Sequence, residues 1–255
     1  MKCKREEMFA ALRAGTIENY MREKENERIV EQKLCLIKLP TGKIVANDPL
    51  MIYEYEPYLI TVAPGEYPVY LYIHHIKTDK RVAFAEIRFT DSLPVRFELA
   101  RTEADKDVVC SPNEYVGYGV DSGTGGFMDE SVVQLLKELD SDQNMEYFDA
   151  VDDLLEESYV HTYSTANFTP KGAGANVAVF SSGYGDGVYG SYWGYDESGE
   201  LCCLLTDFQT IFIQEEEAAA EQEKVQQSDC QKQERAEQEP TEDWGKNMIP
   251  VSARV

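Results

Sequence analysis

The sequence predicts an α+β fold, mainly an antiparallel β-sheet or sandwich with an N-terminal helix and two mid-chain helices. Three observations lead to this prediction. Tyrosine, with 16 residues, outnumbers phenylalanine, with 10, and Val and Ile recur in short runs, a mixture that favours sheet. Glycine and proline turns separate short apolar runs through the first half of the chain. In the middle of the chain the apolar spacing becomes helical.

The first half begins with helix and continues as strands. Residues 4 to 28 carry an apolar stripe at helical spacing, broken at Gly15 and formed by Met8, Phe9, Leu12 and Ile17. Strand-like runs follow, with turns at residues 40–43 and 64–66. In residues 81–90 the alternation places Val82, Phe84 and Glu86 on one face. We therefore expect a series of antiparallel strands up to about residue 103.

Two helices are expected next. Residues 129–140 repeat apolar side chains at helical spacing, and Asp129 or Ser131 can cap the start. Residues 144–158 form a second such segment, whose stripe contains Met145, Phe148, Val151 and Leu155.

Strand signals return at residue 176 and run to Ile213. We expect strands at residues 176–182, 188–196 and 201–213, joined by glycine-rich turns. In the middle strand one face holds Val188, Gly190, Tyr192 and Gly194, and the other holds Tyr189, Ser191, Trp193 and Tyr195. The glycine face indicates close approach of another backbone or a ligand, and the aromatic face suits a core or a contact surface.

Three segments are expected along the chain. Residues 1–33 are an N-terminal helical segment, and residues 34–213 form a single β-rich domain. Residues 214–255 are rich in Glu and Gln and lack an apolar stripe, which predicts a solvated helix or a disordered tail.

The net charge of −23 restricts the partners. Residues 214–255 hold 11 acidic and 5 basic side chains, so most of the negative charge belongs to the residues before them. Such a surface repels nucleic acid and anionic membranes and attracts basic proteins, although an acidic surface also serves solubility. The six cysteines form no C-x-x-C pair, and the longest apolar runs are too short to span a membrane, so we expect a cytoplasmic protein.

The motifs contain no complete catalytic set. The run "VDSGTGG" resembles a serine-protease nucleophile loop around Ser122, and His74 and His75 lie upstream, but the flanking residues do not match that family. The run "SGYGDG" leads from strand into strand, which excludes a nucleotide loop. No cofactor is expected, and the sequence favours a non-enzymatic role.

Aspartates at strand ends and turns are the strongest candidates for chemistry. They are Asp121, Asp129, Asp186, Asp196 and Asp207, and gathered carboxylates hold Mg²⁺ or Ca²⁺. The weak metal-site candidate combines Asp121, Asp186 and Asp207. Structural roles compete with this interpretation, because Asp129 suits a helix cap and Asp186 and Asp196 suit turns.

Several motifs occur in an order that resembles a known family. They are Asn47–Pro49, Ala63–Val69, Val120–Asp129, Ser182–Asp196 and Thr206–Phe208. The chain resembles the bacterial domain of unknown function 4241, whose G-D-G motif is Gly185, Asp186 and Gly187 here. The resemblance covers residues 34–213 and implies no activity. The glycine- and aspartate-rich run also resembles a strand-turn segment of the Smi1/Knr4-like immunity proteins, which implies toxin binding.

Two hypotheses follow. The first is an immunity- or antitoxin-like binding module that attracts a basic protein such as a toxin, with Tyr189, Trp193 and Tyr195 as exposed anchors. The second is a metal-assisted hydrolase or small-ligand binder, with Asp121, Ser122, Asp186 and Asp207 around the glycine face. The candidate binding residues are Asp121, Ser122, Asp129, Ser182, Asp186, Tyr189, Trp193, Asp196 and Asp207.

Overall fold

The structure is a computed structural model, and it describes residues 4–21, 26–51, 55–110, 115–139, 141–160 and 162–211. These residues lie in one unit, Met1–Ile213. The predictions for the tail at 214–255 fall outside the described residues, and the division into three segments stays a prediction. Strand β1, Glu27–Leu39, crosses the boundary that was placed after residue 33.

The predicted fold class is confirmed. The helical elements are α1 (Lys4–Ala14), η1 (Ile17–Tyr20), α2 (Glu130–Glu138) and α3 (Ser141–Ser158). The strands after β1 are β2 (Ile44–Asn47), β3 (Gly65–Ile76), β4 (Asp79–Arg88), β5 (Arg96–Leu99), β6 (Tyr118–Val120), β7 (Thr124–Asp129), β8 (Thr165–Phe168), β9 (Val177–Ser181), β10 (Gly187–Tyr189), β11 (Ser191–Tyr195) and β12 (Leu201–Asp207).

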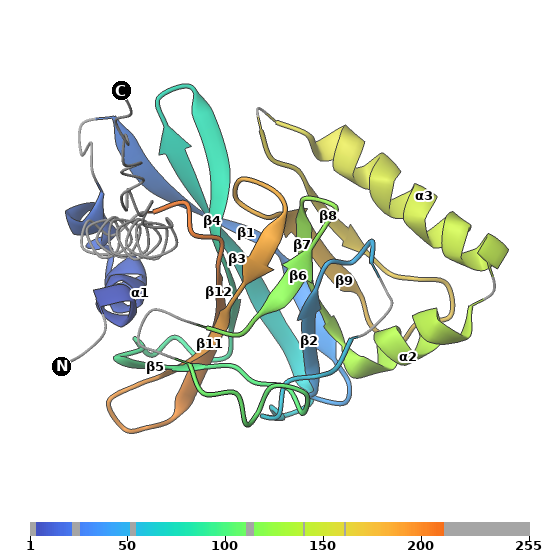
Figure 1. Ribbon diagram of the computed structural model, residues 1–255, viewed down its shortest axis with the longest axis horizontal. Helices are drawn as coiled ribbons and strands as arrows, with labels where there is room; N and C mark the ends of the chain where they lie inside the picture. Colours follow the sequence, from blue (N-terminus) through green and yellow to red (C-terminus); the bar gives the residue numbers. More distant parts are fainter. Residues whose placement is uncertain are drawn as a thin grey trace, which may run out of the picture. The chain divides into compact units, whose positions relative to one another are not determined.

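The strands form three antiparallel sheets (Figure 1). The six-stranded sheet has the order β1-β3-β4-β12-β11-β5, and the four-stranded sheet has the order β2-β7-β9-β8. Strands β10 and β6 form a two-stranded ribbon. Each sheet combines strands that are far apart in the sequence, as in the pairing of β4 with β12.

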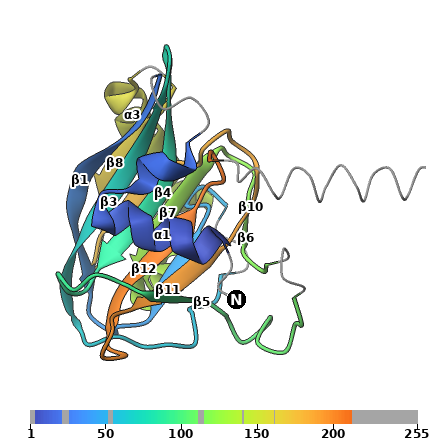
Figure 2. The same cartoon turned by 90° about the vertical axis from the view of Figure 1, so that its left-hand side faces the viewer.

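The sheets and helices stack in four layers. The two larger sheets pack face to face over a core that includes Leu71, Ile87, Phe127, Phe180 and Trp193. Helix α1 covers the outer face of the six-stranded sheet, as Figure 2 shows, through Met8, Phe9 and Leu12. Helices α2 and α3 cover the outer face of the four-stranded sheet. Each element thereby buries its apolar face, which is what a stable layered domain requires.

Helix α2 begins as the sequence predicts. Asp129 is its N-cap, and Oδ1 accepts hydrogen bonds from the Ser131 backbone N at 3.0 Å and from Ser131 Oγ at 2.6 Å. Its Oδ2 accepts from the backbone N and the hydroxyl of Thr41, at 3.0 and 2.8 Å. One buried carboxylate therefore caps the helix and holds the turn between β1 and β2.

The outer edge of β1 is closed by a side chain along part of its length. Asn176 Oδ1 accepts a hydrogen bond from the Lys38 backbone N at 2.9 Å, and Asn176 Nδ2 donates to the Leu36 carbonyl at 3.0 Å. The amide thus takes the donor and the acceptor that a neighbouring strand would use.

Three local expectations are wrong. Ala83 forms a β-bulge, because the register passes from Tyr72–Phe84 to Ile73–Val82, so Val82 packs in the core between the sheets while Phe84 packs beneath α1. Met145 is exposed on α3, and Tyr147 is buried in its stead. The last strand ends at Asp207, before the left-handed backbone of Gln209 (φ 57°).

The strand expected at residues 188–196 is divided. Residues 187–189 pair with β6, whereas residues 191–195 pair with β12 and β5. The division falls at Gly190, whose carbonyl accepts a hydrogen bond from the Asp207 backbone N at 3.1 Å. A Cβ on Gly190 would stand 3.1 Å from Tyr115 Cδ2, which leaves little room for another residue at this corner.

Candidate functional site

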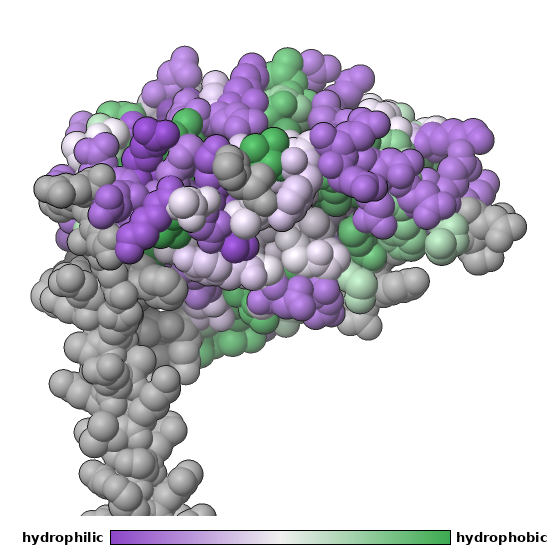
Figure 3. Space-filling model, turned by 90° about the horizontal axis from the view of Figure 1, so that it is seen from above, coloured by the Kyte–Doolittle hydropathy of each residue, from purple (hydrophilic) through white to green (hydrophobic). Residues whose placement is uncertain are grey.

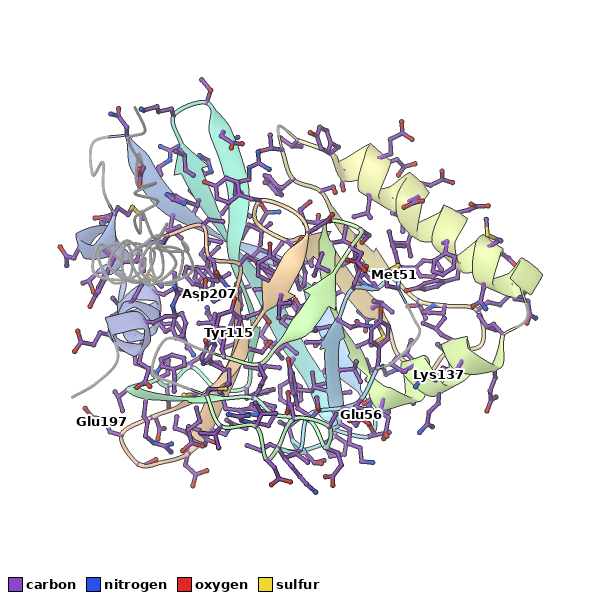
Figure 4. All side chains as sticks on the ribbon, in the orientation of Figure 1. Met51, Glu56, Tyr115, Lys137, Glu197 and Asp207 are labelled. Atoms are coloured by element: carbon purple, nitrogen blue, oxygen red, sulfur yellow. The ribbon has the colours of Figure 1, made fainter. Side chains whose placement is uncertain are left out.

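A cavity of about 780 Å³ lies beside the ends of β2, β6 and α2. Its walls come from the segment after β2, the loop after β5 and the strand β6. Figure 4 labels three of its lining residues, Met51, Glu56 and Lys137. The full lining is Ala46, Met51, Tyr55, Glu56, Tyr58, Ala100, Thr102, Ala104, Asp105, Gly117, Tyr118, Gly119, Asp121 and Lys137. The volume is within the range of ligand-binding pockets.

A buried carboxylate braces one side of this cavity. Asp48 is 0% exposed and follows β2 directly. Its Oδ2 accepts hydrogen bonds from the backbone N of Asp121 at 3.0 Å and of Ser122 at 2.8 Å. Its Oδ1 accepts from Ser122 Oγ at 2.6 Å and from the Leu50 backbone N at 3.0 Å. The buried carboxylate is thus stabilised by backbone and hydroxyl donors, and no ion pair joins it to a cationic side chain of the described residues.

Three tyrosines form the aromatic part of the wall. The Tyr55 hydroxyl donates to the Asp48 carbonyl, and burial together with the Asp48 carboxylate raises the pKa of that phenol above its usual range. The Tyr58 ring lies 5.9 Å from the Trp193 ring in an edge-on arrangement. Burial likewise raises the pKa of Tyr58 and Tyr118, so all three rings stay neutral at physiological pH.

The loop at residues 101–110 frames the opposite side. Arg101 Nη1 donates to the carbonyls of Asp105 and Val108, at 2.9 and 2.8 Å. Glu56 Oε2 accepts from the Ala104 backbone N at 3.1 Å, and the Leu59 backbone N donates to the Arg101 carbonyl at 2.8 Å. The Arg101 side chain thus ties the loop to itself, and the bonds of Glu56 and Leu59 join the loop to the segment after β2.

The lining is acidic. It contains the carboxylates of Glu56, Asp105 and Asp121 and a single cation, Lys137. Lys137 Nζ donates to the Tyr55 carbonyl at 3.4 Å from an exposed position on α2. The cavity therefore offers acceptor oxygens and aromatic faces, which suit a cationic group.

Asp121 and Ser122 are the predicted site residues that the structure places beside this cavity. Ser122 Oγ is hydrogen-bonded to Asp48 and lies 2.6 Å from Thr124 Oγ1. His74 lies elsewhere, with Nδ1 3.1 Å from Thr210 Oγ1 and Nε2 3.3 Å from Glu27 Oε2. The protease-like pairing of Ser122 with His74 is therefore not formed.

The other predicted aspartates have separate structural partners. Asp207 forms an ion pair with Arg5 of α1, and Asp196 accepts the Ser198 backbone N at 2.9 Å in the turn between β11 and β12. The Ser198 hydroxyl bond lowers the pKa of Asp196. Asp186 is exposed at the start of β10. Within the described residues, no group of three or more His, Cys, Asp or Glu side chains is arranged to hold a metal ion.

The expected exposed aromatic anchors are buried. Tyr189 is 6% exposed and Trp193 is 2% exposed, and both belong to the core between the sheets. The Tyr189 hydroxyl donates to the Gly185 carbonyl at 2.8 Å, and Ser182 Oγ donates to the same carbonyl at 2.9 Å. Tyr195 is partly buried beneath Arg96, whose guanidinium carbon lies 4.1 Å from the ring centroid. Tyr189 and Ser182 thus hold the turn at the G-D-G motif through the Gly185 carbonyl.

The glycine face of β11 receives neighbouring side chains. A Cβ on Gly194 would stand 2.5 Å from Cys203 Sγ and 3.0 Å from Phe97 Cε1. Close approach does occur at Gly194, but the approaching groups are side chains of the chain itself and not the backbone or ligand expected from the sequence.

Sequence reasoning missed Asp48 and the tyrosine wall. Asp48 stands in the N-D-P motif, which was one signal for it, but its hydrogen-bond partners lie 73 and 74 residues away in the sequence. Tyr55, Tyr58 and Tyr118 stand in segments without periodicity, and no local pattern marks them as neighbours.

None of the helices in the described part of the chain has the length and apolar character needed to cross a membrane.

Comparisons with known proteins agree with the resemblance. No curated protein and no solved structure matches the chain. A family model described as "Protein of unknown function (DUF4241)" matches residues 37–206, more than half of the 255 residues. The chain therefore belongs to this family, DUF4241.

Proposed function

We propose that the protein is a protein-binding module that receives a basic segment of a partner protein at the acidic cavity. The observation that carries this proposal is the charge of the lining, which contains Glu56, Asp105 and Asp121 but one lysine, Lys137. Opposite charge steers encounter and fixes register at protein interfaces. A basic toxin, as expected for an immunity-like protein, is a partner of this chemistry.

The overall charge of the chain favours association with cations over anions. Hydrophilic side chains predominate on the face drawn in Figure 3. The chain carries −23, and the 11 acidic and 5 basic side chains of residues 214–255 account for −6 of it. This field raises the local concentration of a basic partner, and salt weakens it. The cavity then provides a defined shape for recognition, which a diffuse surface charge does not provide.

The hydrolase alternative has no supporting arrangement among the described residues. Ser122 is bonded to Asp48, and Asp121, Asp186 and Asp207 have separate surroundings. We therefore put forward binding alone.

Affinity capture with two matched variants tests the proposal. Tagged wild type, Asp121→Asn and Glu197→Gln are incubated with lysate of the native host, and bound proteins are identified by mass spectrometry. Asp121 lines the cavity, whereas Glu197 is exposed at the turn between β11 and β12, well away from Glu56 and Lys137 in Figure 4. Each substitution removes one negative charge. We expect a stoichiometric basic protein with wild type and Glu197→Gln, and reduced recovery with Asp121→Asn. Failure to recover such a partner, or equal recovery with both variants, would refute the proposal.

A further inference from the structure

We propose that the cavity is an arginine subsite, in which a guanidinium group of the partner lies against the tyrosine wall and bonds to the Asp121 carboxylate. This inference rests on the proposed function and names the side chain that the cavity recognises. It is argued from the state of the acidic groups, the aromatic wall and the apolar rim.

Asp121 is the lining carboxylate that has both oxygens available to a ligand within the described part of the chain. Glu56 and Asp105 already accept backbone hydrogen bonds, Glu56 from Ala104 at 3.1 Å and Asp105 from Thr102 at 2.7 Å. The backbone N of Asp121 is held by Asp48 at 3.0 Å, which fixes the position of the residue. No described residue donates to the Asp121 carboxylate, and the residue is exposed. It therefore keeps both oxygens for a donor from outside, as a bidentate guanidinium requires.

The aromatic wall favours guanidinium over ammonium. A guanidinium is planar, stacks on aromatic faces and is more weakly hydrated than an ammonium, so entering the cavity costs it less. Tyr55 and Tyr118 are partly exposed in the lining, and Tyr58, which also lines the cavity, is packed in the core behind them. The same chemistry recurs within the protein, where Arg88 lies 3.8 Å from the centroid of Tyr70 and Arg96 lies 4.1 Å from that of Tyr195.

The rim adds contacts for residues beside that arginine. Met51 lines the cavity and is 39% exposed. Leu59 and Val109 are exposed on the two segments that frame it. Met51 therefore gives the acidic cavity a partly exposed apolar contact beside the anchoring charge, and Leu59 and Val109 leave apolar surface on the neighbouring segments. The cavity of about 780 Å³ is large enough for one arginine with its flanking backbone.

Titration with single amino-acid probes tests this inference without the partner. The full chain, isotope-labelled, is titrated by NMR with N-acetyl-arginine amide, N-acetyl-lysine amide and uncharged N-acetyl-citrulline amide. We expect shifts confined to the cavity lining, binding of the arginine probe several-fold tighter than the lysine probe, and no saturable binding of citrulline. Equal affinity for arginine and lysine, or shifts spread over the acidic surface, would overturn the arginine subsite.

Variants that change one charge each then test which side chains contribute to arginine binding. Asp121→Asn is expected to weaken arginine binding by about tenfold, the effect of losing one charge-assisted bond. Glu197→Gln is expected to leave it unchanged. Lys137→Met removes the cation of the lining and is expected to strengthen binding about threefold, a gain that a folding defect cannot produce. No change with Asp121→Asn, or weaker binding with Lys137→Met, would overturn the inference.

The two proposals fail separately. Capture of a basic partner that depends on Asp121, without selective binding of the arginine probe, would leave the binding function standing and refute the arginine subsite. Selective binding of the probe, without any captured partner, would refute the partner proposal alone.

Discussion

The carboxylate of Asp48 accepts a 2.6 Å hydrogen bond from Ser122 Oγ, although the two residues stand 74 positions apart. The same carboxylate holds the backbone N of Asp121 and of Ser122. The turn that carries Asp121 is therefore positioned by the turn after β2, and the cavity wall depends on one buried side chain.

Removal of this carboxylate should destabilise the protein strongly. Asp48→Ala leaves several donors without an acceptor, at about 1–3 kcal/mol for each one that stays buried, so we expect a loss of about 3–5 kcal/mol in the free energy of unfolding. Asp48→Asn keeps one acceptor oxygen and should lose less. Urea denaturation followed by circular dichroism measures both, with exposed Asp186→Asn as the control. A loss below about 1 kcal/mol for Asp48→Ala would contradict the bracing role.

Helix α1 should depend on an ion pair beneath it. Arg13 Nη1 lies 3.3 Å from Oε1 of the fully buried Glu86, whose Oε2 accepts from Tyr72 at 2.6 Å and from Arg88 at 2.9 Å. Arg13→Ala removes one of the two cations beside a buried charge, and we expect a loss of about 2–4 kcal/mol.

The exposed pair of Arg96 with Glu98 provides the matched control for Arg13. Arg96→Ala also removes the contact with the Tyr195 ring, but it should still cost less than Arg13→Ala, because solvent screens the pair with Glu98. Equal losses in the free energy of unfolding for the two alanine variants, measured by chemical denaturation, would show that the buried pair stabilises the protein no more than the exposed one.

Substitution by alanine should change stability differently at two glycines. Gly194→Ala brings a methyl group to 2.5 Å from Cys203 Sγ, and overpacking of this kind costs about 1–3 kcal/mol. Gly119→Ala in β6 meets no atom within 4 Å and should be close to neutral. Thermal unfolding of both variants distinguishes a packed glycine face from a ligand-binding one, since unchanged stability of Gly194→Ala would point to open space there.

His74 should make stability depend on pH. Burial lowers the pKa of His74 below its ordinary value of 6.5, against the opposing effect of Glu27. A lowered pKa means that the unfolded chain takes up the proton first, so stability is complete above pH 6.5 and falls as the pH drops toward the folded-state pKa. The steepest contribution is about 1.4 kcal/mol per pH unit.

Substitution isolates this titration. His74→Gln should flatten the dependence of the free energy of unfolding on pH between 6.5 and 5, whereas His75→Gln should preserve it. Denaturation curves at half-unit pH steps provide the measurement. An unchanged slope in His74→Gln would assign the acid sensitivity to other groups.

Local patterns predicted the elements whose signals lie within a few residues. The stripe of α1 and the cap of α2 by Asp129 are confirmed, because helical periodicity and capping are properties of neighbouring residues. Strand β7 escaped prediction. Its glycines suggest a turn, yet all six of its residues are buried between β2 and β9. Its strand character comes from those neighbours.

The candidate site was the hardest part to predict. The aspartates were chosen for their residue type, and the structure gives Asp129, Asp196 and Asp207 local or ionic partners. Asp121 and Ser122 do lie at the cavity. Their relation to Asp48 and the tyrosines is a tertiary one. Tyr189 and Trp193 do share a side, as the alternation predicts, but that side is the core between the sheets and not an exposed surface.

The amide of Asn176 has a consequence for how molecules of this protein meet. By occupying the Lys38 backbone N and the Leu36 carbonyl, it withdraws these groups from any strand that a second molecule could add. At this stretch of the sheet edge, the strands of two molecules cannot pair with each other. The protein is therefore protected there, even in concentrated solution, from the edge-to-edge association that leads to fibrous aggregates.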